Sequence, residues 1–286
     1  MCVKHLGRYD AFALTEVKTG EIEVLDFSES ASSRECVERT IGEYVAPTYV
    51  GGAKSRDYSA LVERLVRMGH ESPFEFIRCG WERDDNARAL GIEEVIKRWN
   101  PTIGDILKRK VLTVKVSTSI VVARQWVRHR TFSFAERSRR YVSGERKPFS
   151  FYFPAEAGNK AIVKDIIGDV YDYAVDGYAE LRESGVKAES ARFVIPVGVE
   201  TEFLVQGTVE AWFNFLALRT DKHAQADIRV IAELIVDVIN TLPDLEGFRE
   251  ELINYAPTYV LKAPPEFRPA REKLVKAFLR RLGLGW

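Results

Sequence analysis

The order of strand-like and helical segments constrains the fold of this chain more than any other feature. Residues 111–117 alternate in polarity as a strand does, and they lead into a helical pattern at 118–128. Residues 200–207 are also strand-like and are followed by an amphipathic helix over 209–218. Strands and helices mix in this way without a regular βαβ rhythm. The pattern therefore favours an α+β fold, in which a mixed or antiparallel sheet packs with long helices.

Further elements are expected on either side of these segments. The first residues predict a hairpin with its turn at 18–21, and a short strand is expected at 74–81. The remaining expected elements are helices at 30–44, 58–68, 160–183, 187–194 and 223–241, and a basic helix from 269 that ends at Gly283. The charged residues 82–110 are interpreted as an insertion within a single domain that spans residues 1–286.

Positive and negative side chains balance over the whole chain. Lys and Arg together number 42, as do Asp and Glu, which argues against a protein whose entire surface binds polyanions. Any anionic ligand must therefore be held by a local group of cations. Cys2, Cys36 and Cys79 are far apart and odd in number, so neither a disulfide framework nor a bound metal is expected.

The composition also bears on where the protein works. No apolar run approaches the about 18 residues that a membrane span needs, and the first residues lack the apolar region of a signal peptide. A cytoplasmic protein without a membrane partner is expected. Asn and Gln are scarce, Met occurs only twice, and Arg and Val are plentiful, which is a bias typical of thermophiles.

A basic island lies between Arg124 and Lys147, where eight Lys and Arg stand against two Glu. The planar fork of arginine suits phosphate, so several of these side chains, with the hydroxyl of Ser138, could cradle phosphoryl groups. A solvated helix face is the plainer interpretation. Aromatic residues interleave the charges, however, and basic residues among aromatics also suit single-stranded nucleic acid. The aromatic residues are Trp126, Phe132, Phe134 and Tyr141.

Three other segments could carry chemistry. The corner at residues 69–76 offers Ser72 and His70, although a helix end with a surface histidine explains it equally. Arg192 has only apolar neighbours, which indicates a partner or ligand unless its charge reaches solvent. Polar residues at helical spacings along 214–225 indicate a pocket wall. Motifs for dinucleotide folds, nucleoside triphosphatases, zinc peptidases and serine hydrolases are absent from the sequence.

Five ordered blocks make the chain resemble the flavin-dependent thymidylate synthases, over residues 60–245 or so. The most specific of them is the pattern RHR-x7-S, formed by Arg128-His129-Arg130 and Ser138. The others are His70-Glu71-Ser72-Pro73-Phe74-Glu75, Ala123-Arg124-Gln125-Trp126, Ala191-Arg192-x-Val194-x-Pro196 and Leu218-Arg219-x3-His223-Ala224-Gln225.

The resemblance implies methylation of the uracil ring of dUMP. Methylenetetrahydrofolate would be the carbon donor, non-covalently bound FAD the redox carrier and NADPH the reductant. It also implies a homotetramer whose active sites combine residues of several subunits, with small-molecule partners and no nucleic acid. Arg219 is the implied catalytic residue, because a fixed cation beside the uracil favours ionisation at N3. No cysteine of the enzyme would attack the ring.

The resemblance also assigns binding residues. The positions implied for dUMP are Gln125, Arg128, Glu136, Arg137, Ser138, Arg139, Arg140, Arg192 and Arg219. The positions implied for FAD are Ser72, Arg128, His129, Arg130, Glu136, Thr208, Val209, Glu210 and Asn214.

The chain departs from the usual family pattern at several of these blocks. Ala135 replaces Asn, Phe76 replaces His, and Thr208 and Glu210 replace what is more often Asn and Arg. An acidic Glu210 beside a flavin phosphate requires another cation to compensate it. Two other functions stay open from the sequence: a diverged relative that uses a pyrimidine-nucleotide and flavin site for different chemistry, and a single-stranded nucleic-acid-binding protein.

Overall fold

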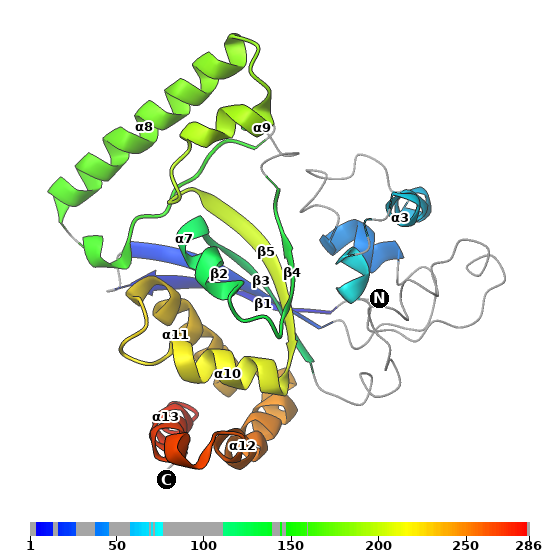
Figure 1. Ribbon diagram of the computed structural model, residues 1–286, viewed down its shortest axis with the longest axis vertical. Helices are drawn as coiled ribbons and strands as arrows, with labels where there is room; N and C mark the ends of the chain where they lie inside the picture. The colour runs from blue at the N-terminus through cyan, green and yellow to red at the C-terminus, as the bar shows by residue number, and fades with distance from the viewer. Residues whose placement is uncertain are drawn as a thin grey trace.

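The fold is built on a five-stranded antiparallel sheet with the strand order β1-β2-β3-β5-β4 (Figure 1). The computed structural model describes residues 4–13, 17–26, 38–45, 58–68, 70, 72–76, 111–138, 144, 147–158 and 160–284. The strands are β1 (Lys4–Ala13), β2 (Val17–Asp26), β3 (Val111–Ser119), β4 (Ser133–Glu136) and β5 (Glu200–Thr208). The expected α+β class is confirmed.

Strands β3 and β5 form the centre of the sheet. They pair antiparallel over their full length, from Val111 opposite Thr208 to Ser119 opposite Glu200. Because side chains alternate along a strand, one face carries Val114, Val116 and Val205, all fully buried. This face holds the main core. It is covered by α7 (Ile120–Trp126), α10 (Val209–Arg219) and α11 (Ala226–Thr241).

Helix α10 is the central helix of the core, because it is apolar on nearly every side. The amphipathic pattern expected for this helix was therefore wrong. Trp212, Phe213 and Phe215 on it have no exposed surface. The indole N–H of Trp212 donates to the carbonyl of Leu112 at 2.9 Å, and the ring of Phe215 stacks on Trp126 at 4.2 Å. Helices α12 (Glu246–Leu261) and α13 (Arg268–Arg281), with short 3-10 turns at Pro243–Leu245 and Pro265–Phe267, pack against it.

The opposite face of the sheet is only partly apolar. A small cluster of Leu25, Val45, Phe76, Ala135 and Leu204 joins it to η1 (Thr40–Val45) and η2 (Ser72–Phe76). Helix α3 (Tyr58–Arg67) lies beside these turns (Figure 1). Elsewhere this face carries charged side chains.

Helix α8 (Ala161–Glu183) lies along one edge of the molecule, away from α10–α13 (Figure 1). Only Ala174 and Tyr178 on it are buried. Tyr171 stacks on Phe151 at 4.1 Å and so fixes the helix against the segment that contains η3 (Ala155–Ala157). Helix α9 (Ala188–Ala191) and η4 (Arg192–Val194) return the chain to β5.

Most expected elements are confirmed, with shifts of a few residues at their ends. The hairpin turn expected at 18–21 was wrong, because these residues lie inside β2 and pair with β1. The strand expected at 74–81 was also wrong where it is described, since residues 74–76 belong to η2. The proposed insertion at 82–110, and residues 30–37 of the helix expected at 30–44, lie outside the described residues. No described helix is long and apolar enough to cross a membrane.

We expect the aromatic core around α10 to dominate stability. Phe215→Ala should lower the free energy of unfolding by about 3–5 kcal/mol, since a buried phenyl ring leaves a cavity. Phe193→Ala is a matched control, because Phe193 is 87% exposed, and it should change stability by less than about 0.5 kcal/mol. Urea unfolding followed by circular dichroism measures both. Equal losses for the two variants would contradict the packing described.

Candidate functional site

Four of the residues predicted to contact dUMP line one pocket. Glu136 ends β4, Arg137 and Ser138 follow it, and Arg192 begins η4. The pocket has a volume of about 340 Å³ and also involves Thr201 and the ring of Phe149. The pairing of β4 with β5 brings the first three to the end of α9, although 54 or more residues separate them from Arg192 in the sequence.

Arg137 is held firmly in the wall of this pocket. Its side chain is 5% exposed, and its guanidinium contacts Glu200 at 3.2 Å and Glu202 at 2.8 Å. The backbone N–H of Arg137 also donates to the carbonyl of Glu202 at 2.7 Å. A buried guanidinium needs such partners, because an unpaired buried charge is costly. The contacts of Arg137 with Glu200 and Glu202 were not predicted from the sequence.

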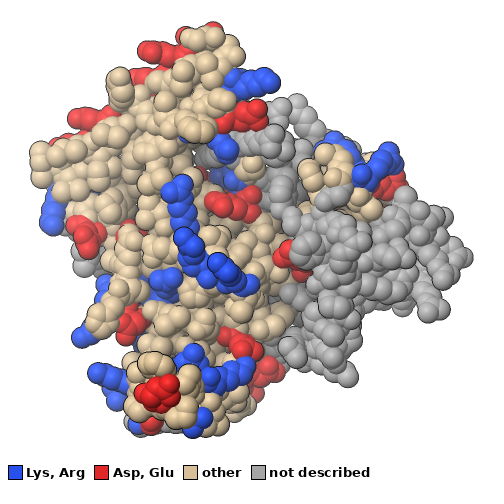
Figure 2. Space-filling model, in the orientation of Figure 1, with Lys and Arg blue, Asp and Glu red and all other residues tan. Residues whose placement is uncertain are grey.

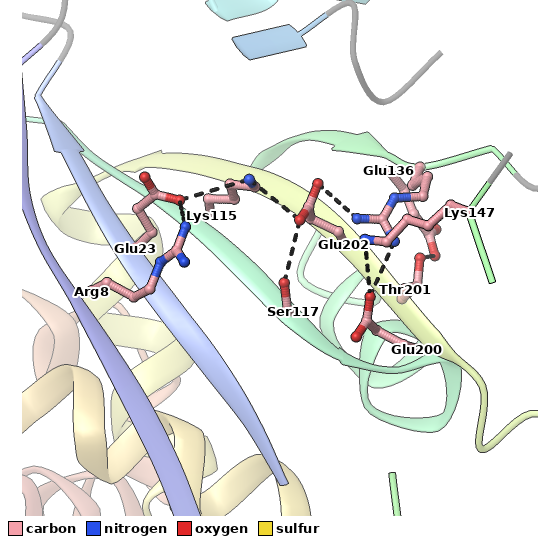
Figure 3. A network of polar contacts seen from close by, with 10 residues as sticks. Arg8, Glu23, Lys115, Ser117, Glu136, Lys147, Glu200, Thr201 and Glu202 are labelled. Atoms are coloured by element: carbon pink, nitrogen blue, oxygen red, sulfur yellow. Dashed lines mark hydrogen bonds and ion pairs between the residues drawn. The ribbon is translucent and has the colours of Figure 1, made fainter. Parts of the chain in front are cut away.

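The pair of carboxylates belongs to a longer network across the sheet, which we call the charge ladder (Figure 3). Lys147 contacts Glu200 at 3.3 Å, and Lys115 contacts Glu202 at 3.3 Å. The ladder continues from Lys115 to Glu23 at 3.7 Å, and from there to Arg8 at 3.5 Å. Burial alone would raise the pKa of Glu202, but Lys115, Arg137 and Lys147 outweigh it and lower that pKa. Glu202 is therefore a carboxylate held in its charged form.

Glu136 and Arg192 line the same pocket, and each has fewer polar contacts described than Arg137. The hydroxyl of Thr201 donates to Glu136 at 2.8 Å. Loss of solvent around its carboxylate raises the pKa of Glu136, and the Thr201 bond and nearby Arg124 oppose this. Arg192 is exposed, and its Nε donates to the carbonyl of Glu189 at 3.1 Å. Of the two interpretations of Arg192, the structure shows the one in which its charge reaches solvent, and Arg192 lines the pocket.

A second group of predicted residues surrounds Arg219 at the end of α10. Its Nε donates to Nε2 of His129 at 3.0 Å, and Nη2 donates to the carbonyl of Gln125 at 3.4 Å. A guanidinium has no acceptor, so Nε2 of His129 carries no proton and Nδ1 does. Burial, and then the charge of Arg219, lower the pKa of His129 to about 4. A neutral His129 thereby orients the guanidinium of Arg219.

Gln125 connects this group to another pocket. Its side-chain amide donates to Gln225 at 2.7 Å, and Gln225 donates to Asp227 at 2.9 Å. Asp227 is buried and accepts a bond from the backbone of Ala155 at 2.8 Å. Gln225 and Asp227 line a pocket of about 360 Å³ against α8. The sequence pattern had indicated Gln225 as part of a pocket wall, but it had not indicated Asp227.

Four of the residues predicted for FAD, Thr208, Val209, Glu210 and Asn214, lie at the start and in the first two turns of α10. Thr208 precedes the helix and its side chain makes no capping bond, so the first amide groups of α10 are not capped by it. Such amides suit phosphate oxygens. Asn214, two turns on, accepts from the hydroxyl of Tyr259 at 3.2 Å. The RHR turn packs nearby, because the rings of His129 and Phe215 lie 5.1 Å apart. These residues fit an anionic cofactor with a flat ring.

The acidic Glu210 in this turn has the compensating cation that the sequence analysis required. Lys262, at the end of α12, contacts Glu210 at 2.6 Å. It also donates to the hydroxyl of Tyr255 at 3.1 Å, and these two bonds raise the pKa of Lys262. Lys262 lies 52 residues away in the sequence, so sequence reasoning had no signal that could pair it with Glu210.

Exposed cations complete the surface of this region. Arg124, Arg128 and Arg130 are exposed. Figure 2 shows Lys and Arg side chains in the middle of this face, over α7 in Figure 1. The predicted residues Arg139 and Arg140 lie outside the described residues, as does the side chain of Ser72. Within one chain the described site residues thus form three groups, one on the pocket of Arg137, one around Arg219 and one at the start of α10.

Most of these residues lie in a segment that matches a known protein family. Residues 91–243 match the family described as thymidylate synthase complementing protein, and Ser72 is the one predicted site residue outside that range. The chain is 34% identical over 184 residues to a flavin-dependent thymidylate synthase of Thermotoga neapolitana, which covers 62% of this chain and 68% of the relative. It is 29% identical over 236 residues to one of Thermus thermophilus, covering 77% of this chain and 74% of the relative.

The burial of His129 beside Arg219 should make the stability of the fold depend on pH. The pKa of His129 is about 4 in the folded protein and about 6.5 in an unfolded chain, so the unfolded state binds more protons between these values. Stability should therefore fall as the pH drops through 6.5 toward 4, by on the order of 3 kcal/mol at most.

The variant His129→Gln isolates this contribution. Its urea midpoint should fall less than that of the wild type between pH 7.5 and pH 4.5, since glutamine does not titrate. Acidic side chains titrate in both proteins, so only the difference between the two is informative. Parallel curves would contradict a neutral, buried His129.

Proposed function

The chain belongs to the thymidylate synthase complementing protein family, and on that premise we propose that it methylates dUMP to dTMP. The proposed carbon donor is methylenetetrahydrofolate, and the proposed cofactor is FAD, reduced by NADPH. The relatives compared above are named flavin-dependent thymidylate synthases. An enzyme that transfers a one-carbon unit is the function that follows directly from membership.

One observation carries the proposal of a nucleotide substrate. Two segments that are distant in the sequence place Glu136, Arg137, Ser138 and Arg192 on a single pocket. Guanidinium groups and a hydroxyl suit a phosphate, and the ring of Phe149 offers a flat apolar wall. The pocket volume, about 340 Å³, is in the range of small-molecule sites. A mononucleotide matches both the size and the charges.

Arg219 is the residue proposed to act on the base. Its guanidinium would lie at the uracil edge, stabilise negative charge as N3 loses its proton, and so make C5 more nucleophilic. His129 and the carbonyl of Gln125 hold it in place. Bound FAD, once reduced, would supply the hydride that completes the methyl group. The residues proposed to hold the cofactor are Ser72, Arg128, His129, Arg130, Glu136, Thr208, Val209, Glu210 and Asn214.

A homotetramer with shared active sites is also proposed, and helix α8 supports self-association. Ile162, Ile166, Val170 and Tyr173 follow one face of α8 and are 66%, 58%, 53% and 83% exposed. An apolar stripe of this kind on a soluble protein is typical of an interaction surface. A second copy of the chain would cover it, and could bring the residues around Arg219 in one subunit to the pocket of Arg137 in another.

The interpretation as a single-stranded nucleic-acid-binding protein loses support. Base stacking requires exposed aromatic rings. Trp126 is fully buried and Phe132 is 7% exposed, so these rings of the basic island belong to the core. The cations between them remain at the surface, where they suit small anionic ligands.

The proposal predicts a specific activity. The purified protein should bind FAD, show flavin absorbance, and form dTMP from dUMP with methylenetetrahydrofolate and NADPH. Arg219→Lys should keep the fold and lower turnover by about tenfold or more, because an ammonium does not reproduce a planar fork at a ring edge. Chromatography of the nucleotides measures both. If the purified protein shows neither flavin absorbance nor dTMP formation after FAD is added, the proposed function is wrong.

Self-association has its own test. The double change Ile166→Lys with Tyr173→Lys should reduce the mass measured by light scattering, because charges would enter the apolar stripe. The matched control is Asp165→Lys with Asp172→Lys, two exposed neighbours on the same helix. The control should keep the wild-type mass. A wild-type monomer, or equal effects of both pairs, would argue against an interface on α8.

A further inference from the structure

We propose that Lys115 and Glu202, which lie outside the pocket, set the net charge around Arg137 and thereby determine how strongly the pocket binds a nucleotide phosphate. This inference rests on the proposed function, because it concerns the phosphate of the same substrate. Neither residue is assigned a role by the sequence blocks. Both act through Arg137 and are therefore positioning residues.

The geometry shows how the two residues reach Arg137. Glu202 uses one carboxylate oxygen for Arg137, at 2.8 Å, and the other for Lys115, at 3.3 Å. Lys115 and Glu202 come from the neighbouring central strands β3 and β5, and Ser117 opposite Glu202 donates to the same oxygen as Lys115 at 3.5 Å. Because Glu202 contacts both residues, loss of the charge of Lys115 changes the electrostatic environment of Arg137 through this one side chain.

The balance of charge around Arg137 depends on its neighbours. Two carboxylates, Glu200 and Glu202, contact the single positive charge of Arg137, which they would more than neutralise. Lys147 and Lys115 each contact one of these carboxylates. Among the described residues, these three cations and two anions sum to one net positive charge next to the pocket, and Glu23 and Arg8 further along the charge ladder offset each other. Without Lys115 that local sum falls to zero.

The environment makes this charge effective. The side chains of Arg137, Glu200 and Glu202 are 5%, 17% and 21% exposed, so solvent screens them less than it screens surface pairs. Lys115 is 31% exposed and does not line the pocket. Glu136 adds a carboxylate on the pocket wall itself, and Arg192 adds a cation there. Positive and negative charges therefore nearly cancel around the proposed phosphate position, so that gain or loss of one charge should change the affinity for phosphate.

The test compares binding of dUMP with binding of deoxyuridine, which lacks the phosphate. Lys115→Met should weaken dUMP binding by about tenfold and leave deoxyuridine within about twofold, as expected for the loss of one partly buried charge near a phosphate. Under turnover it should raise KM for dUMP more than it lowers kcat. Lys115→Arg should restore binding, since it restores the cation. Isothermal titration of the full-length protein measures these affinities.

A second change distinguishes charge from structure. Adding Glu202→Gln to Lys115→Met removes one anion with the cation, so dUMP affinity should return most of the way to that of the wild type. Lys18→Met is the matched control, because Lys18 forms a similar ion pair with Glu21 on β2 at 3.0 Å and is 38% exposed. The control should bind both ligands as the wild type does.

Each outcome decides the inference. Equal weakening of dUMP and deoxyuridine by Lys115→Met would show a merely structural role and overturn it, as would unchanged dUMP affinity. Failure of the Lys115→Met, Glu202→Gln double variant to recover would also overturn it. A wild type that binds neither ligand would overturn the proposed function and this inference together. If the wild type binds dUMP and the variants do not behave as expected, only the role given to the charge ladder is overturned.

Discussion

The antiparallel pairing of β3 with β5 is the constraint on which the rest of the structure depends. Nine residue pairs hold the two strands in register. β3 leads directly into α7 and the RHR turn, while β5 leads directly into α10, so this register brings His129 to Arg219 at the far end of α10. The pairing of β4 with β5 in the same sheet places Glu200 and Glu202 beside Arg137, which follows β4 at the edge of the sheet. The residues on the pocket of Arg137 and the residues around Arg219 are therefore both held by one sheet.

The two faces of that sheet have different tasks. One face buries valine and phenylalanine side chains under α7, α10 and α11 and supplies the stability of the fold. The other carries the charge ladder, where each carboxylate lies between two cations (Figure 3). An overall neutral composition is thus compatible with a site for anions, since the charges are arranged locally and partly neutralised in advance. An arginine proposed to bind phosphate need not carry an uncompensated charge.

The sequence predicted the long elements well and the contacts between distant residues poorly. Helices α8 and α11 have apolar periodicity, α10 is a nearly continuous apolar segment, and β3 alternates in polarity, so their positions followed from local patterns. Strand β4 has only four residues within a basic segment and gives no clear period, and α12 contains Pro257, which is unfavourable inside a helix. The partners of Arg137 and Glu210 were missed because Glu200, Glu202 and Lys262 are brought near only by tertiary structure. Glu210 nevertheless predicted that a cation must lie nearby, and Lys262 is that cation.

We propose that the pocket of Arg137 receives the phosphate of a pyrimidine nucleotide while Arg219 faces the base. A crystal structure of the protein with dUMP would show both contacts. We expect phosphate density in the pocket bounded by Arg137, Ser138 and Arg192, with the uracil edge at an Arg219 guanidinium, whether from the same subunit or from another. Phosphate density elsewhere, with this pocket filled only by solvent, would contradict this placement of the nucleotide.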